Sequence, residues 1–172
     1  MIFIDRNAAK PPEDFERRGT AGTEQLISAI GSKKPVRVNP RILHLAKPKL
    51  AELFHGKCAY CESPIEATSP GEVEQFRPKG SVKAEQGHPG YWWVAYRWEN
   101  LLFSCPTCNR AKGSHFPIRG KRAFNPDYSL GQEDPLLLDP GADDPVGHLR
   151  FTKEGLVEGL DERGEKTVEI IK

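Results

Sequence analysis

The sequence predicts an α+β fold in which a small zinc-stapled core follows N-terminal helices and precedes a C-terminal β-hairpin. Three observations support this prediction. Four cysteines form two Cys-x-x-Cys pairs, apolar residues recur at helical spacing before the first pair, and a strand-like segment with a turn follows the second. We expect a helical or extended region over 1–52, the zinc-stapled core over 53–123, and an acidic extension with the hairpin over 124–172.

The composition is that of a soluble globular domain. The 172 residues, with 37% apolar and 28% charged, suit a single domain with a substantial core, and 15 prolines and 16 glycines predict short elements. No apolar run approaches the roughly 20 residues that span a bilayer. The N-terminal apolar stretch is short and contains an acid, unlike a signal peptide. We therefore expect a cytoplasmic protein with no membrane partner.

The N-terminal region is expected to begin with a short strand and to continue as helices. The strand is MIFIDR, and a Pro-containing polar connection follows it. Residues 12–34 predict one or two modest helices that end at Gly31. Residues 40–58 predict a further helix, which Pro48 is expected to split or restart because proline lacks the amide donor. The apolar positions of this helix are Ile42, Leu43, Leu45, Leu50, Leu53 and Phe54.

All the cysteines fall in two pairs, Cys58 with Cys61 and Cys105 with Cys108. Two-residue spacing lets both thiolates of one tight turn reach the same metal, and two such turns complete the tetrahedral sulfur set that zinc favours. Two disulfides are the alternative, which a reducing cytosol disfavours, and a redox site would need only one pair. Four thiolates leave no open position, so this zinc is expected to hold the fold and to do no chemistry.

The segment between the cysteine pairs and the C-terminal region contain further predicted elements. Residues 72–76 alternate weakly and predict a strand, and residues 106–113 predict a short helix. Residues 91–105 hold all three tryptophans, which we expect in the core; a base-stacking platform is the alternative. Residues 148–157 predict a hairpin with its turn at Glu154 and the next glycine. The chain stops within an apolar-patterned segment, which suggests a longer natural protein.

Charge is distributed unevenly, although the formal net charge is +1. Residues 1–72 hold 11 Lys/Arg against 9 Asp/Glu, residues 73–123 hold 9 against 3, and residues 124–172 hold 5 against 12. The basic block coincides with the cysteine frame, which predicts a surface that faces a polyanion. The acidic C-terminal block is either a docking surface or a solvated face.

Several motifs in and after the cysteine frame carry a resemblance to a known family. They are CAYCE, VEQFRPK, HPGYWW, WENLLFSCPTCNRAKGSHFP and PLLLDP. Over residues 53–151 they resemble the HNH endonuclease superfamily, and more closely the bacterial HNH proteins associated with retron and Septu-type (PtuB-like) phage defence. The resemblance implies a ββα-metal finger, in which two short antiparallel strands and a helix clasp one divalent ion.

The resemblance also assigns roles to residues at matching positions. Glu74 matches the acidic ligand of one catalytic Mg²⁺ or Mn²⁺, and Asn109 matches the second ligand; taken singly, they would be a solvated strand carboxylate and a helix-start residue. Asn100 matches the asparagine that braces the loop and orients the base. Such oxygen ligands suit magnesium, which would neutralise charge in the transition state of phosphodiester hydrolysis. The basic residues expected to meet nucleic-acid phosphates are Arg77, Lys79, Arg110 and Lys112.

The pattern breaks at Gln75, where the family has a general-base histidine. A glutamine amide can position a water but cannot take its proton, and loss of a general base costs about 10² to 10⁴ in rate. Gln75 is therefore an inactivating change, or another histidine serves in its place, or the chain does no catalysis. The candidate replacements are His88 and His115, whose ordinary roles would be to fix a turn and to cap or solvate a helix end.

Three functional hypotheses follow. The first is a metal-dependent endonuclease that hydrolyses DNA as the effector of an anti-phage defence system, for which the resemblance implies an ABC/Rad50-like ATPase partner. The second is a catalytically inactive, zinc-stabilised nucleic-acid-binding or assembly module. The third is an interaction scaffold that binds no nucleic acid. Salt-sensitive binding under the first two would come from Lys79, Lys83, Arg110, Lys112, Arg119, Lys121 and Arg122.

Overall fold

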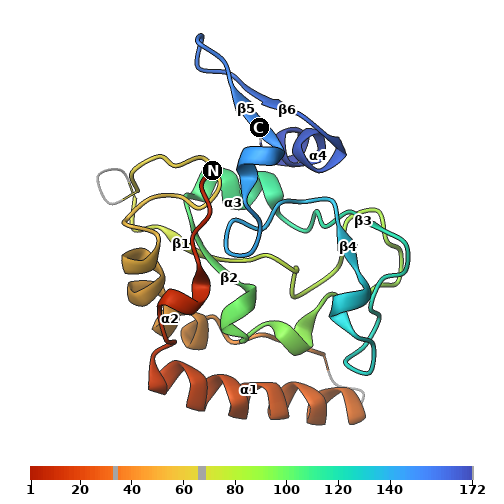
Figure 1. The fold of residues 1–172 in the computed structure, drawn as a ribbon. Coiled ribbons are helices and arrows are strands. Elements are labelled where there is room, and N and C mark those ends of the chain that lie inside the picture. Colours follow the sequence, from red (N-terminus) through yellow and green to blue (C-terminus); the bar gives the residue numbers. More distant parts are fainter. Residues whose placement is uncertain (33–34, 66–68, 172) are drawn as a thin grey trace.

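The fold is built around an antiparallel pair of short strands (Figure 1). The structure, a computed structural model, describes residues 1–32, 35–65 and 69–171. Its helices are α1 (Glu13–Gly31), α2 (Pro40–Leu53), α3 (Pro106–Lys112) and α4 (Glu162–Ile171). Its strands are β1 (Glu72–Gln75), β2 (Leu101–Ser104), β3 (Ile118–Arg119), β4 (Asp134–Pro135), β5 (Leu149–Phe151) and β6 (Val157–Gly159). This mixture of helices and small sheets confirms the predicted α+β class.

The β1–β2 pair determines which side chains share a face. Its register sets Glu72 opposite Ser104 and Glu74 opposite Leu102. Because successive side chains of a strand point to opposite faces, Glu72 and Glu74 lie on one face and Gln75 on the other. Helix α3 bonds to the two glutamates, and α2 also contacts both strands. Strand, strand and helix therefore follow one another along this part of the chain.

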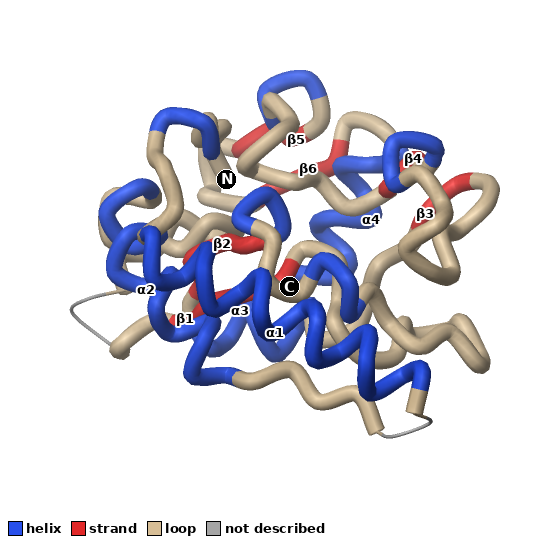
Figure 2. The backbone as a smooth tube through the Cα atoms, turned by 90° about the horizontal axis from the view of Figure 1, so that it is seen from below, coloured by secondary structure: helices blue, strands red, loops and turns tan. Residues whose placement is uncertain are grey.

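Helix α1 is one continuous helix where the sequence predicted one or two. Two glycines allow it to approach Tyr96 closely, since a Cβ would lie 3.1 Å from Tyr96 Cβ at Gly19 and 2.7 Å from Tyr96 Cε2 at Gly22. Phe15 packs edge-on against Trp98, with ring centroids 6.3 Å apart. Figure 2 shows α1 crossing the molecule beside α2, with which it is in contact. This packing offsets the poor helix propensity of the internal glycines.

Helix α2 runs through Pro48 without interruption, so the predicted split is wrong. The carbonyl of His44 loses its helical hydrogen bond to Pro48, but both residues are exposed and water can satisfy that oxygen. The opposite face holds the helix in place through its buried side chains, which are Ile42, Leu43, Ala46 and Leu50.

Replacing Pro48 with alanine is expected to raise the free energy of unfolding by about 1–3 kcal/mol, because alanine restores the amide donor to His44. Urea unfolding followed by circular dichroism measures the change. Pro40→Ala is the matched control, since proline is well tolerated at the first helical position and the expected change is below about 0.5 kcal/mol. Equal changes in the two variants would contradict the prediction.

The first six residues form no strand within the described part of the chain, which corrects a second prediction. Ile4 N donates a single ladder-like bond to Pro140 O at 2.8 Å. Arg6 is buried, donates from Nε to Leu101 O at 3.1 Å, and donates from both terminal nitrogens to the carboxylate of Asp139. The buried ion pair between Arg6 and Asp139, and not pairing within a sheet, therefore holds this segment against the rest of the protein.

The C-terminal region contains the predicted hairpin. Strands β5 and β6 pair antiparallel, and Thr152 N donates to Leu156 O at 2.8 Å across the turn. Gly155 has φ +80°, which glycine adopts without strain. Figure 1 shows this hairpin projecting at the far end of the molecule from α1. Helix α4, which the sequence analysis did not predict, follows the hairpin and contacts β6 and α3.

The core draws on all parts of the described chain. The three tryptophans, Trp92, Trp93 and Trp98, are buried, as predicted for core residues. The same hydrophobic cluster reaches from Met1 to Ile170. The regions over 1–52, 53–123 and 124–172 are therefore divisions of the sequence that contribute to one core.

Candidate functional site

The four cysteines converge from two turns of the chain. Cys58 and Cys61 follow α2, and Cys105 and Cys108 open α3, with Cys105 as its N-cap residue. All four sulfurs lie within 4.8 Å of one another, and those of Cys61 and Cys105 are 4.0 Å apart. Around a zinc ion with Zn–S bonds of about 2.3 Å, tetrahedral sulfurs would lie about 3.8 Å apart. The four thiols are free of disulfides, so this arrangement fits a zinc site.

The charge of the cluster also favours a bound cation. The thiol of Cys108 donates a hydrogen bond to Cys58, which lowers the pKa of Cys58 to about 4 and raises the pKa of Cys108. The backbone N–H of Cys108 points to the sulfur of Cys105 at 3.4 Å. A zinc ion held by four thiolates would take the place of the shared proton.

Acidic and amide side chains meet on the face of β1 that α3 covers. Asn109 Nδ2 donates to Glu72 Oε2 at 2.5 Å. The structure therefore brings Asn109 to Glu72, a residue that the sequence analysis did not single out, whereas Glu74 has a different partner. Glu72 precedes Glu74 by two positions, and side chains two positions apart in a strand point to the same face. This period could have identified Glu72 as a candidate site residue. Oxygen donors from both elements are present here, and they suit a hard divalent cation.

Glu74 forms a buried ion pair with Lys112. Lys112 Nζ lies 2.5 Å from Glu74 Oε1 and donates to Gln75 O at 2.7 Å. Burial raises the pKa of Glu74 and lowers the pKa of Lys112, and the attraction between the two groups counters both shifts. Lys112 has no exposed surface, so the structure gives this residue an internal partner in place of the nucleic-acid phosphate expected from the sequence.

A cavity of about 240 Å³ adjoins this ion pair. Glu74 and Gln75 line it on the strand side. Burial raises the pKa of Glu74, and the charge of Lys79, which is exposed, opposes that shift. The cavity thus offers an ammonium and hydroxyl groups that can bind a phosphate, and the Glu74 carboxylate would tolerate that phosphate only with a cation between them. The remaining lining residues are Pro78, Gly80, Ser81, Gly113 and Ser114.

The two predicted residues next to this cavity make backbone contacts. Gln75 Nε2 donates to Ala95 O at 2.8 Å, so its amide is held by the segment before β2. Asn100 Oδ1 accepts from Arg77 N at 2.8 Å, and its Nδ2 donates to Arg77 O at 3.1 Å and to Val94 O at 3.2 Å. Asn100 therefore braces the loop after β1, and its role toward a catalytic base stays a prediction.

The two alternative histidines have different environments. His88 is buried, its Nδ1 accepts from Gly90 N at 3.0 Å, and its Nε2 lies 2.9 Å from Ala123 O. Both ring nitrogens are engaged, which disfavours a role as general base. Burial and the nearby charges of Lys83 and Lys112 lower the pKa of His115. His115 lines a neighbouring cavity and does not line the one beside Glu74.

The other basic residues predicted to contact phosphates fall into two groups, one exposed and one with partners inside the protein. Lys79 and Arg110 are exposed, as a nucleic-acid contact requires. Arg77 donates from Nε to Glu133 Oε2 at 2.9 Å, and its guanidinium lies 5.3 Å from the centroid of the Phe116 ring. Glu133, which the sequence analysis missed, also accepts a hydrogen bond from Tyr91. Arg77 therefore has structural partners, and no local sequence signal links it to a carboxylate so distant in the chain.

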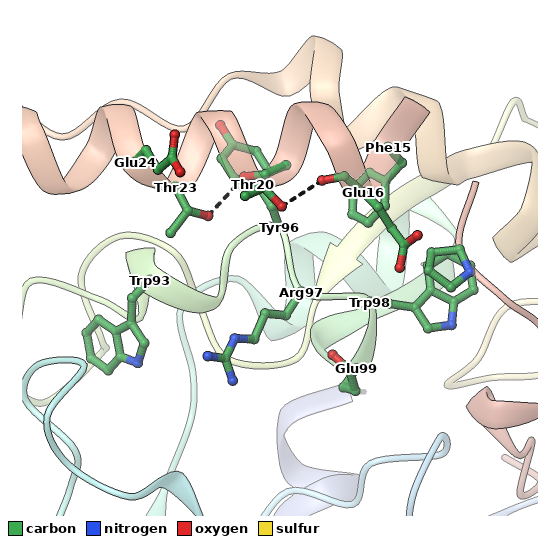
Figure 3. Close-up of a pocket in the computed structure, with 12 residues that line it drawn as sticks. Phe15, Glu16, Thr20, Thr23, Glu24, Trp93, Tyr96, Arg97, Trp98 and Glu99 are labelled. Atoms are coloured by element: carbon green, nitrogen blue, oxygen red, sulfur yellow. Dashed lines mark hydrogen bonds between the residues drawn. The ribbon is translucent and has the colours of Figure 1, made fainter. Parts of the chain in front are cut away.

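The largest cavity described, about 420 Å³, lies elsewhere. Figure 3 shows it between α1 and residues 93–99, with Glu16 and Glu24 on the helix side and Glu99 on the other. Arg97 is the basic residue in its lining. An acidic rim of this kind repels phosphate, so the smaller cavity beside Glu74 is the better candidate for a nucleic-acid site.

Together, the fold and the cysteine cluster define a small α+β protein with a four-thiol metal-type centre beside a strand–strand–helix unit. The chain is similar to Septu protein PtuB of Bacillus mycoides (strain KBAB4), with 45% identity over 72% of this chain and 45% of the relative. It is also similar to Septu protein PtuB of Bacillus thuringiensis, with 30% identity over 73% of this chain and 39% of the relative. Septu protein PtuA of Bacillus mycoides (strain KBAB4) shows 34% identity over 69% of this chain and 17% of the relative.

The chain spans less than half the length of each of these relatives. No family model matches it, and no solved structure matches it. Within the described residues, none of the helices has the length and apolarity needed to cross a lipid bilayer. The comparisons therefore relate the chain to Septu proteins over about seven-tenths of its length.

Proposed function

We propose that the chain is a metal-dependent, HNH-type endonuclease that hydrolyses phosphodiester bonds of DNA. One observation supports this proposal above the others: β1 and α3 bring Glu72, Glu74 and Asn109 to one face, next to a cavity with an exposed lysine. One Mg²⁺ or Mn²⁺ held by such oxygen donors would neutralise charge on the phosphate in the transition state. Structural zinc at the four cysteines would hold α3 against the strands.

The similarity to Septu proteins supports a role in anti-phage defence. Septu proteins named PtuA and PtuB both match this chain, so we propose that the protein works within a system of more than one component. The resemblance in the sequence implies an ABC/Rad50-like ATPase as the partner subunit. The acidic stretch over 124–172 is the candidate surface for such a partner, because its charge is opposite to that of the basic block over 73–123, which is expected to face nucleic acid.

A plasmid-nicking assay with Mg²⁺ or Mn²⁺ tests the nuclease proposal. We expect slow nicking by the natural sequence and a loss to background in Glu74→Ala and Asn109→Ala. Gln75→His is expected to raise the rate by about 10² to 10⁴, because it supplies a general base near neutral pKa. Arg150→Ala, on an exposed hairpin ion pair, is the matched control and should leave nicking unchanged.

A catalytically inactive nucleic-acid-binding module is the second candidate function. It is favoured by the engaged amide of Gln75 and by the lysine that already holds Glu74. This module would bind DNA with a steep loss of affinity in salt, while neither the natural sequence nor Gln75→His would cut. An absence of salt-sensitive DNA binding would contradict both candidates and favour a protein-interaction scaffold.

A further inference from the structure

Lys112 forms an ion pair with Glu74, a residue proposed above to hold a divalent cation. Its ammonium is 2.5 Å from Glu74 Oε1, 2.7 Å from Gln75 O and 3.5 Å from Gly113 O. The side chain of Lys112 has no exposed surface, and that of Glu74 is 7% exposed. Glu74 Oε1 accepts no hydrogen bond from the described residues, so its close contact with the Lys112 ammonium is an ion pair. The carboxylate therefore already has a resident cation from the chain itself.

We infer that Lys112 sets the divalent-cation affinity of this site by occupying Glu74, an inference that rests on the cation site of the proposed function and not on cleavage itself. A Mg²⁺ ion at a ligand distance of about 2.1 Å would place a second cation beside the ammonium on one buried carboxylate, where little water screens the repulsion between the two cations. Lys112 and a divalent cation thus compete for Glu74. In this proposal the lysine withdraws from Glu74 Oε1 when a metal ion takes that oxygen.

The neighbouring cavity provides the place to which Lys112 can withdraw. It adjoins the ion pair through Glu74 and Gly113 and has a volume of about 240 Å³. A nucleic-acid phosphate in this cavity would offer the ammonium a new anionic partner. Binding of nucleic acid and release of Glu74 are then coupled, and the site remains closed to metal ions until its substrate is present.

Isothermal titration of Mn²⁺ into the zinc-loaded protein tests the competition without relying on activity. Lys112→Met removes the ammonium with little change in volume and should bind Mn²⁺ at least tenfold more tightly than the natural sequence. Arg110→Met removes a charge from the exposed side of the same helix and should change the affinity by less than about twofold, because solvent screens it. An affinity in Lys112→Met no higher than in Arg110→Met would overturn the inference.

Two further variants keep the test decisive. If Lys112→Met loses its zinc or its helical signal, Lys112→Gln repeats the measurement with a donor retained for the Gln75 carbonyl. Glu74→Gln should abolish Mn²⁺ binding at this site, and retained binding would also overturn the inference.

If Lys112→Met binds Mn²⁺ more tightly while no variant nicks DNA, the nuclease proposal fails and the inference stands. If DNA is nicked while the Mn²⁺ affinities are equal, the inference fails and the nuclease proposal stands.

Discussion

Replacing Cys108 with serine is expected to abolish zinc binding and to unfold the core around α3. Zinc sites of this type contribute about 10–16 kcal/mol of apparent binding free energy, which is comparable to the whole stability of a domain. Cys108 is buried and lies on α3, which packs against β1 and α4, so loss of this ligand affects all three elements. Zinc content per chain and the thermal unfolding midpoint measure the effect.

Ser63→Ala provides the control for this substitution. Ser63 lies 3.3 Å from the sulfur of Cys61 through its hydroxyl but supplies no thiolate. The variant should keep its zinc and lose little stability. If Cys108→Ser retained as much zinc as Ser63→Ala, the four-thiolate assignment would be wrong.

Asp139→Asn is expected to lower the free energy of unfolding by about 3–5 kcal/mol, because it leaves a buried guanidinium without its counter-charge. The side chains of Arg6 and Asp139 are 6% and 10% exposed, so water cannot replace the lost partner. The change keeps the shape of the side chain, and equilibrium denaturation in urea measures its cost.

Asp134→Asn is the matched control for the buried pair. Asp134 pairs with Arg119 at 2.9 Å, but both side chains are 51% exposed and the expected cost is about 0–1 kcal/mol. Equal losses in the two variants would show that burial does not set the value of the Arg6–Asp139 pair.

The sequence predicted the parts of the fold that have local signals. The cysteine spacing predicted one cluster, and the glycine at 155 predicted the hairpin turn. The predictions failed where tertiary contacts decide the outcome. Buried side chains on one face of α2 keep the helix intact through Pro48, and a charge pair 133 residues apart replaces the expected N-terminal strand.

The candidate site shows the same limit. The resemblance selected Glu74, Asn109 and Asn100; in the structure Glu74 and Asn109 lie on neighbouring elements, and Asn100 bonds to the loop after β1. Lys112 and Arg77 were predicted to contact nucleic-acid phosphates because both are basic. A sequence shows the charge of a side chain but does not show whether that side chain is buried. The carboxylate partners of the two basic residues are Glu74 and Glu133, which become visible only when the chain is folded.

The bond from Lys112 to Gln75 uses the carbonyl oxygen of the main chain. This bond does not depend on which side chain residue 75 carries. Glutamine and histidine codons differ by a single base, so the residue can be exchanged in evolution without disturbing the lysine beneath it. Such an exchange would break the side-chain bond from Gln75 to Ala95 O and would leave the ion pair between Lys112 and Glu74 in place.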